Sequence, residues 1–394
     1  MEKFFLQVLG LGPAGLGPFL AADQAGRLSD VLSKGVIWFD SKTLGQAGAI
    51  GGYDIISNSP VGDYLEVINP QGFFASVLQS RVGKFLATQT ARSSQIPLAL
   101  VGELAGELQK RLGEIVSGFP QSQIQTGVKV DSIRWDGNGF TTFSEGRELA
   151  VSEKILLACG AQEQVMPVLV SLGRKVILAS DVICNRTECA GNIHIFGASH
   201  SMASVLWKLN RNLGRVTVWH RSSVKFFYPS VVEAKADGYK FTGNDVCPIT
   251  GRVHRFGGIR SPYRELVQEA VREGWVQFRF FDSIESIMPE LVCASVIVQA
   301  TGFRANKVQI FGAEQGHSGP LLNGSGHLMV DADCRVHCQC CRTPIPGAFA
   351  LGLGHQPPPA PELGGEPSYQ GPVDGFNLYG GTVGKTVLRS LVGN

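Results

Sequence analysis

The chain has 394 residues, and at about 150 residues per domain this length predicts two to three domains. Hydrophobic residues make up 44% and charged residues 17%, a balance that excludes an intrinsically disordered chain. The net charge is only +2, which gives no reason to expect nucleic acid or a membrane surface as a partner. The 49 glycines exceed the usual share of about 7%, and they indicate tight turns and close backbone approach to a ligand.

The cysteine count and the apolar runs bear on the cellular compartment. The chain has nine cysteines, an odd number, and it is long enough to be stable without disulfide bonds. Both observations argue against a disulfide framework and favour reduced thiols in a cytoplasmic protein. Glycines and prolines interrupt the apolar amino terminus between residues 10 and 18, which favours a turn over a signal peptide. No apolar run reaches the roughly 18 residues of a spanning helix, so we expect no transmembrane segment.

A glycine-rich turn follows the first predicted strand, residues 4–9. The turn has the pattern G-x-G-x-x-G, and a helix-compatible stretch follows it; its residues are Gly10, Leu11, Gly12, Pro13, Ala14 and Gly15. In such a turn the first glycine makes the bend, the second lets the backbone approach a pyrophosphate, and the third lets helix and strand pack closely. The amino terminus of the helix then offers free N–H groups to the phosphates.

A second predicted strand, residues 36–39, ends at Asp40 and is followed by Ser41. An acidic residue at the end of this strand usually accepts hydrogen bonds from ribose hydroxyls. Because the turn, its context and the acid coincide, we predict a dinucleotide site here. The alternative is a glycine-rich turn without a ligand.

The next segment predicts one helix and a set of strands. Leucines and valines at helical spacing run from Leu98 to Leu112, and residues 123–143 resemble strands with a turn at 136–139. An apolar strand at 154–158 then ends in Cys159, Gly160 and Ala161.

The pattern of strand, turn, helix and strand then begins again. A strand-like run at 192–196 precedes a second turn, a helix-compatible stretch and a strand at 215–219; the turn contains Gly197, Ser199, His200 and Ser201. The second strand is followed by Arg221 instead of an acid, and an arginine there favours NADP over NAD because it accommodates a 2′-phosphate. Serines replace the commoner glycines, so a structural layer without a ligand stays an alternative.

The remaining elements are less regular at first. Residues 223–262 show no clear period, whereas 263–272 predict a helix and 276–281 and 295–299 predict strands. The last strand leads into Ala300, Thr301, Gly302 and Phe303. A turn feeding a buried strand at 345–352, a stretch rich in Pro and Gly at 355–372 and a final helix from about Gly381 complete the chain.

The order of these motifs resembles the flavoproteins with two dinucleotide-binding domains. It is most similar to the flavin-containing monooxygenases and to the amino-acid N-hydroxylases of the ornithine type, on the His200-Ser201 element and the A-T-G-F element at Ala300. The resemblance implies an α/β fold in which a Rossmann-like FAD domain is interrupted by a second Rossmann-like NAD(P)H domain. We expect the FAD domain at 1–165 and 306–394 and the inserted domain at 166–305.

The resemblance also implies roles for single residues. The first turn and Asp40 would bind FAD, and Gly352 and Leu353 would lie near the flavin. The helix that begins near Gly381 and Thr382 would point at the flavin ring. Further candidates at the cofactors are Gly160, Thr301, Gly302 and Gly354, and the second turn with Arg221 would face NADPH. Ser57 and Asn58 are candidates beside the ring, although they equally suit a turn before a proline.

The cysteines do not support disulfide reduction. Residues 41–60 contain no cysteine, whereas disulfide reductases of this fold carry a C-x-x-x-x-C pair there; Cys184 and Cys189 have that spacing before the second turn instead. The densest group is Cys334, Cys338, Cys340 and Cys341, which lacks the second pair of a usual zinc site, so we predict no metal. A redox-sensing thiol and an ordinary surface loop stay open for this group.

The sequence therefore predicts an FAD-dependent, NADPH-using monooxygenase that hydroxylates a heteroatom of a small molecule through a flavin peroxide. Nitrogen is the favoured acceptor by resemblance, and O₂ is the second substrate. Residues 223–262 contribute either to the substrate site or to the surface of the second domain. A flavin oxidase that ignores NADPH and a non-catalytic flavoprotein sensor are the alternatives, and homo-oligomerisation is left open.

Overall fold

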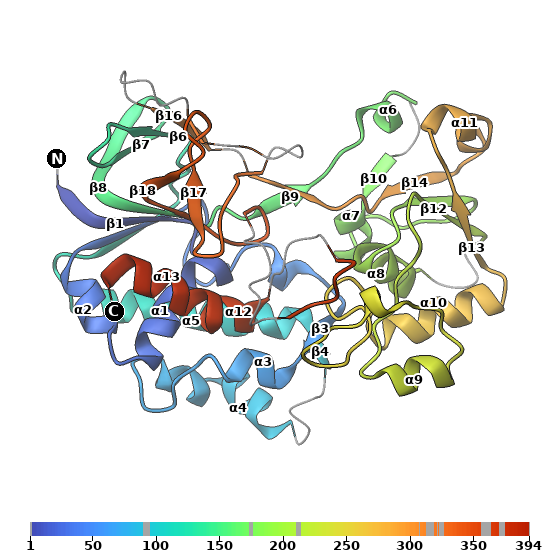
Figure 1. The fold of residues 1–394 in the computed structure, drawn as a ribbon, viewed down its shortest axis with the longest axis horizontal. Helices are drawn as coiled ribbons and strands as arrows, with labels where there is room; N and C mark the ends of the chain where they lie inside the picture. The colour runs from blue at the N-terminus through green and yellow to red at the C-terminus, as the bar shows by residue number, and fades with distance from the viewer. Residues whose placement is uncertain are drawn as a thin grey trace.

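The computed structural model of the chain describes residues 2–89, 95–172, 176–209, 214–306, 308–312, 319–320, 322, 327–355, 364–369 and 375–393. Two large sheets with helices packed against them make up most of this part of the chain (Figure 1). The first sheet takes its strands from both ends of the chain, and the second takes its strands from the middle. This α/β arrangement confirms the predicted fold class.

The first sheet is mixed. Its central strand β1 runs parallel to β2 and β8, while β6, β7 and β8 form an antiparallel meander. In spatial order its strands are β16 (Gln309–Gly312), β6 (Ser132–Trp135), β7 (Phe140–Ser144), β8 (Arg147–Leu157), β1 (Lys3–Leu9), β2 (Val36–Asp40) and β5 (Gln123–Thr126), and β18 (Pro344–Ala350) pairs with both β8 and β17 (Arg335–His337).

Helices from both ends of the chain accompany this sheet. Figure 1 shows the carboxy-terminal helices beside α1, the helix that follows the first glycine turn. The helices are α1 (Pro13–Gln24), α2 (Leu28–Ser33), α3 (Val61–Leu65), α4 (Arg81–Thr88), α5 (Leu98–Val116), α12 (Phe376–Gly380) and α13 (Thr382–Val392), with short 3₁₀ turns η1 (Ile50–Gly52) and η2 (Ala75–Gln79). Helix α5 confirms the helix predicted from the leucine spacing, and its buried residues include Val101, Leu104, Leu108 and Leu112.

The second sheet is parallel throughout. Its order is β10 (Val176–Leu178), β14 (Val296–Gln299), β11 (Ile193–Phe196), β12 (Val216–His220) and β13 (Val276–Phe280). The accompanying helices are α6 (Pro167–Val170), α7 (Ala179–Ile183), α8 (His200–Lys208), α9 (Val231–Ala236), α10 (Tyr263–Arg272) and α11 (Ile284–Val292), with the 3₁₀ turn η4 (Gly243–Asp245). Helix α10 has the bounds predicted for it, whereas α11 was not predicted.

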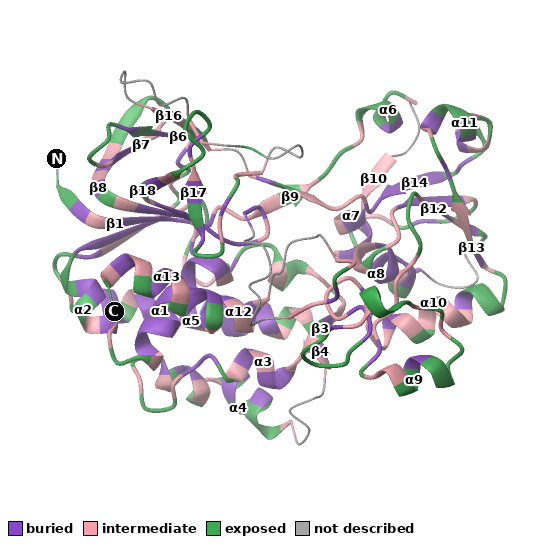
Figure 2. Cartoon of the chain, viewed as in Figure 1, coloured by how far each residue is buried: buried purple, intermediate pink, exposed green. Residues whose placement is uncertain are grey.

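Two short strand pairs complete the described chain. β9 (Ala161–Glu163) pairs antiparallel with β15 (Phe303–Ala305), where the chain passes from the first sheet to the second and back. β3 (Ile56–Pro60) pairs with β4 (Gln95–Pro97). The central strands are the most deeply buried parts of both sheets (Figure 2).

A buried glutamine ties β1 to its neighbours in the first sheet. The Gln7 side chain is fully buried, and its Nε2 donates to the carbonyl oxygen of Phe140 at 3.0 Å and to Ser152 Oγ at 2.9 Å. Its Oε1 accepts from Thr142 Oγ1 at 2.6 Å. A polar side chain is stable in this position only because both ends of its amide are hydrogen-bonded.

The substitution Gln7→Leu removes the hydrogen bonds made by both ends of the amide and leaves the Thr142 hydroxyl without its acceptor. We expect the free energy of unfolding to fall by about 2 kcal/mol, measured by urea denaturation. Gln277→Leu, an exposed glutamine on strand β13, is the matched control and should leave stability nearly unchanged. Equal stabilities of the two variants would contradict the role given to Gln7.

Candidate functional site

At the first glycine turn, the backbone of Gly10 lies very close to the ends of two neighbouring strands, β8 and β2. Gly10 has φ +99°, and a Cβ added to it would lie 2.3 Å from the carbonyl oxygen of Ala158, at the end of β8. Its N–H donates to the carbonyl oxygen of Phe39 at 2.8 Å, at the end of β2. A residue with a side chain cannot occupy this position, so the glycine fixes where α1 starts.

Gly12, two residues later, faces open space. A Cβ at this position would have no atom of the described chain within 4 Å, and no side chain caps α1 here. Pro13 occupies the first helical position, and Ala14 follows it near Gly352, where an added Cβ would lie 3.0 Å from that of Ala14. An uncapped helix start beside open space is the environment that binds a phosphate group.

Asp40 has a second role that the sequence did not predict. Its Oδ2 accepts from the Leu11 N–H at 2.7 Å, and its Oδ1 accepts from the Lys42 N–H at 2.8 Å. The carboxylate therefore holds the glycine turn while it stands at the end of β2, where a ribose acceptor is expected. Ser41 beside it is exposed.

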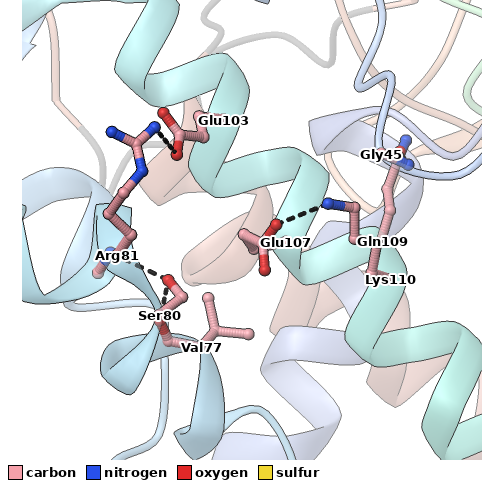
Figure 3. Close-up of polar contacts among 9 residues, drawn as sticks. Gly45, Val77, Ser80, Arg81, Glu103, Glu107, Gln109 and Lys110 are labelled. Carbon is pink, nitrogen blue, oxygen red and sulfur yellow. Dashed lines mark hydrogen bonds and ion pairs between the residues drawn. The ribbon is translucent and has the colours of Figure 1, made fainter.

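Gln109 is a site residue that sequence reasoning missed. This buried residue of α5 donates from Nε2 to the Leu11 carbonyl oxygen at 2.7 Å, and its Oε1 accepts from the Gly45 N–H at 2.9 Å. Figure 3 shows Gln109 and Gly45 together with the ion pairs of Glu103 and Glu107 on the same helix. The only local signal was one polar residue among the buried positions of α5.

The second glycine turn repeats the geometry of the first. Gly197 has φ +112°, and an added Cβ would lie 2.2 Å from the carbonyl oxygen of Ala300, at the end of β14. Its N–H donates to the carbonyl oxygen of Trp219, at the end of β12, at 2.9 Å. Ser199 is exposed and precedes α8 without capping it by its side chain. The start of α8 is thus built like the start of α1.

The polar residues around the second turn are fixed in different ways. His200 Nε2 accepts from the backbone N–H of Arg260 at 3.2 Å, and burial, with the nearby Arg260 charge, lowers the pKa of His200 to about 4. The imidazole is therefore neutral at pH 7. Ser201 is half-buried, and Arg221 is exposed with its guanidinium 4.9 Å from the ring centre of Phe281.

Four of the predicted residues lie where the two sheets are connected. Thr301 Oγ1 donates to the carbonyl oxygen of Gln164 at 2.9 Å, and the Gln164 N–H donates to the carbonyl oxygen of Gly302 at 2.8 Å. An added Cβ at Gly354 would lie 2.7 Å from the carbonyl oxygen of Gly160. These residues form the crossover between the two glycine turns.

The candidates for the ring environment lie on other elements. Ser57 on β3 is buried and its Oγ donates to the Ser59 carbonyl oxygen at 2.5 Å, whereas Asn58 is exposed. Gly381 separates α12 from α13, and Thr382 begins α13 as an exposed residue. Leu353 is half-buried beside Gly352. Ser57 also shares a side-chain hydrogen bond with Tyr64, whose ring centre lies 5.5 Å from that of Phe376 on α12, the helix before Gly381.

The carboxy-terminal thiols are closer together than their spacing suggests. The Sγ atoms of Cys338, Cys340 and Cys341 lie within 4.8 Å of one another, with 3.1 Å between Cys338 and Cys340. Cys334 is buried in the first core instead, and burial raises the pKa of its thiol to about 12. Cys334 is therefore an inert packing residue.

Comparison with known proteins identifies this architecture. No protein-family model matches the chain. A cadaverine monooxygenase from Erwinia amylovora, solved with bound FAD, is 11% identical with a TM-score of 0.62 over all of this chain and 95% of that one. The ornithine hydroxylase of Pseudomonas aeruginosa is 13% identical with a TM-score of 0.62, over 99% of this chain and 98% of that one. The chain has the fold of the two-dinucleotide-binding flavoproteins.

A curated relative extends this likeness to the sequence. The CMP-5′-(3-aminopropyl)phosphonate hydroxylase of Streptomyces rubellomurinus is 28% identical over 444 residues, which cover all of this chain and 98% of the relative. The predicted resemblance to the flavoproteins with two dinucleotide-binding domains is confirmed at the level of the fold, and the relative in sequence is a hydroxylase. Among the residues that the structure describes, no helix is long and apolar enough to cross a membrane.

The hydrogen bonds of Gln109 give a testable consequence. Gln109→Leu leaves the Leu11 carbonyl and the Gly45 N–H unpaired, so the first glycine turn should lose its fixed geometry and retain nucleotide at least about tenfold less well. The measurement is the ratio of bound nucleotide to protein after dialysis, followed by absorbance. Gln7→Leu is the control, because it destabilises the same sheet without contacting the turn. Equal loss of nucleotide in both variants would contradict a specific role for Gln109.

Proposed function

We propose that the chain is an FAD-dependent monooxygenase that uses NADPH and O₂ to hydroxylate the amine nitrogen of a small molecule. The observation that carries this proposal is the repeated turn geometry, in which the helix starts at Gly12 and Ser199 are both uncapped by side chains. Two such starts on one chain suit two dinucleotides. The relationship to a hydroxylase over the whole length supports the same reaction class.

The residues of the first unit fit FAD. Open space at Gly12 and the free start of α1 suit a pyrophosphate, and Asp40 stands where a ribose is expected. Gly352 and the start of α13 after Gly381 would approach the flavin end. FAD, when bound, supplies the acceptor for the NADPH hydride and the reaction with O₂. We assign residues 1–165 and 306–394 to this unit.

The residues of the inserted unit, 166–305, fit NADPH. Ser199 and the start of α8 would hold the pyrophosphate, and the exposed guanidinium of Arg221 would bind the 2′-phosphate. The neutral imidazole of His200 already accepts a backbone hydrogen bond, which makes it a positioning residue at this helix start.

Nitrogen is the proposed acceptor because relatives of this fold act on amines. The curated hydroxylase is named for a substrate with an aminopropyl group, and the two solved enzymes are named for ornithine and cadaverine. The balanced reaction is an amine with O₂, NADPH and H⁺, giving a hydroxylamine, water and NADP⁺. Transfer of one oxygen atom to nitrogen and of the other to water accounts for the two electrons of NADPH.

Disulfide reduction, which this fold also supports, lacks a reactive thiol at the first turn. Cys159 is the cysteine beside Asp40, and burial together with the Asp40 charge raises the pKa of its thiol to about 12. A thiol with so high a pKa is protonated at pH 7 and is a poor nucleophile.

The reaction is tested by incubating the FAD-loaded protein with NADPH, O₂ and a panel of primary amines. We expect NADPH and O₂ to be consumed in equal amounts, and mass spectrometry should find a product 16 mass units heavier than its amine, which is the addition of one oxygen atom. Consumption of O₂ without NADPH would show an oxidase and overturn the proposal.

Replacement of the proposed 2′-phosphate ligand gives a separate prediction. Arg221→Ala should raise KM for NADPH about tenfold or more and leave KM for NADH nearly unchanged, because only NADPH carries the 2′-phosphate. Steady-state kinetics with both nucleotides measure this. Arg272→Ala, on α10 of the same unit, is the matched control. Equal effects of Arg221→Ala on the two nucleotides would contradict the assignment.

A further inference from the structure

Three arginines gather where the inserted unit faces the first unit. Arg252, Arg255 and Arg260 lie in the segment 223–262, and the charge of Arg260 interacts with both of the others. The same guanidinium interacts with Asp63 on α3 and with Glu366 near the carboxy terminus. We call Arg252, Arg255 and Arg260 the arginine cluster. The cluster lies between three parts of the chain, which are the segment 223–262, helix α3 and the region around Glu366.

Packing and backbone contacts hold Arg255 and Arg260 in place. The Arg260 Nη2 donates to the Arg255 carbonyl oxygen at 2.8 Å, and its guanidinium lies 4.6 Å from the ring centre of Phe227. The Arg255 guanidinium lies 4.8 Å from the ring centre of Phe256, and its Nη1 donates to the Cys247 sulfur at 3.7 Å. Guanidinium groups stacked on aromatic rings are oriented before a ligand arrives.

Two carboxylates, those of Asp63 and Glu366, lie near the arginine cluster. Within the described chain, Arg252 and Arg260 form no ion pair, and Arg260 uses one of its guanidinium nitrogens in a hydrogen bond. Glu366 is buried, but its carboxylate accepts from the N–H groups of Phe256 and Gly257 at 3.2 and 2.9 Å. Glu366 therefore holds the loop that carries the arginines. Neighbouring guanidinium groups such as those of Arg252 and Arg260, which keep N–H donors outside any ion pair, favour an anionic ligand.

The cluster lies beside the elements assigned to the flavin end. Asp63 interacts with Arg252 and Arg260, and its neighbour Tyr64 packs against Phe376 of α12 with 5.5 Å between ring centres. Helix α12 leads directly to the start of α13. Figure 1 shows the segment with α9 next to strands β3 and β4, and the Tyr263 hydroxyl donates to the Ile56 carbonyl oxygen on β3 at 2.8 Å.

We propose that the arginine cluster is the subsite for a phosphate or phosphonate group on the amine substrate. Asp63 supplies the opposite charge in the same region, so the site as a whole matches a zwitterion with an ammonium group at one end and a phosphorus oxyanion at the other. The substrate role rests on the proposed function, whereas the anion site does not. The curated hydroxylase is named for a substrate that carries both groups, an aminopropyl chain and a phosphonate.

Binding is measured by calorimetry on the FAD-loaded protein, with NADP⁺ in excess so that the anion cannot occupy the nucleotide site. The probes are 3-aminopropylphosphonate and 1-aminopropane, which differ only in the phosphonate. We expect the phosphonate to bind at least tenfold more tightly, and Arg252→Ala and Arg260→Met each to remove about tenfold of that affinity. Lys235→Ala, an exposed cation on α9 of the same segment, is the control and should change nothing.

The outcomes separate the two proposals. Equal affinity for both probes, or phosphonate binding unchanged by either arginine variant, would overturn the anion subsite. A raised KM for NADPH in the variants, with the phosphonate unaffected, would place the cluster in the nucleotide site and overturn it too. Arginine-dependent phosphonate binding without any hydroxylamine product would support the subsite and refute the proposed function. Arg252 is exposed, so its replacement tests the subsite even where Arg260→Met does not fold.

Discussion

The architecture depends on one contact that occurs twice: a glycine pressed against the carbonyl oxygen that ends a neighbouring strand. A Cβ added to Gly10 would lie 2.3 Å from that oxygen, and one added to Gly197 would lie 2.2 Å from it. These distances are too short for any side chain to fit. In both places the glycine N–H also bonds to the end of the strand on its other side. This pair of contacts fixes the point where each helix begins, and with it the direction of the first free N–H groups.

Everything assigned to function lies around these two helix starts or between them. The antiparallel pair β9 and β15 carries the chain from one to the other and back. Hydrogen bonds of Tyr263 to β3 and of Glu366 to the loop at 256–257 tie the inserted unit to segments from both ends of the chain. Because these ties come from distant segments, the junction between the units is set by long-range contacts and not by the turns themselves. The arginine cluster lies in this junction.

Local sequence patterns were sufficient to predict those parts of the fold that depend only on residues close together in the chain. The glycine turns need residues without side chains, and α5 and α10 need apolar residues at helical spacing, so their sequences carry the information. Gln109 could not be predicted in the same way, because its acceptor, Leu11, is 98 positions away in the chain. Asp63 likewise lies near Arg252 and Arg260 only in the folded chain, because almost 190 or more positions separate it from them in the sequence. The role of Asp40 in holding the turn was missed because the motif describes only its ribose contact.

The central claim is that two nucleotide sites on one chain cooperate in a redox reaction. Its most direct test is rapid mixing of the FAD-loaded protein with NADPH in the absence of O₂, while the visible absorption band of oxidised flavin is recorded. Our account predicts that the band bleaches rapidly with NADPH and that its colour returns when O₂ is admitted. A bound flavin that keeps its colour in excess NADPH would show that the second helix start serves no nucleotide, and it would contradict the account.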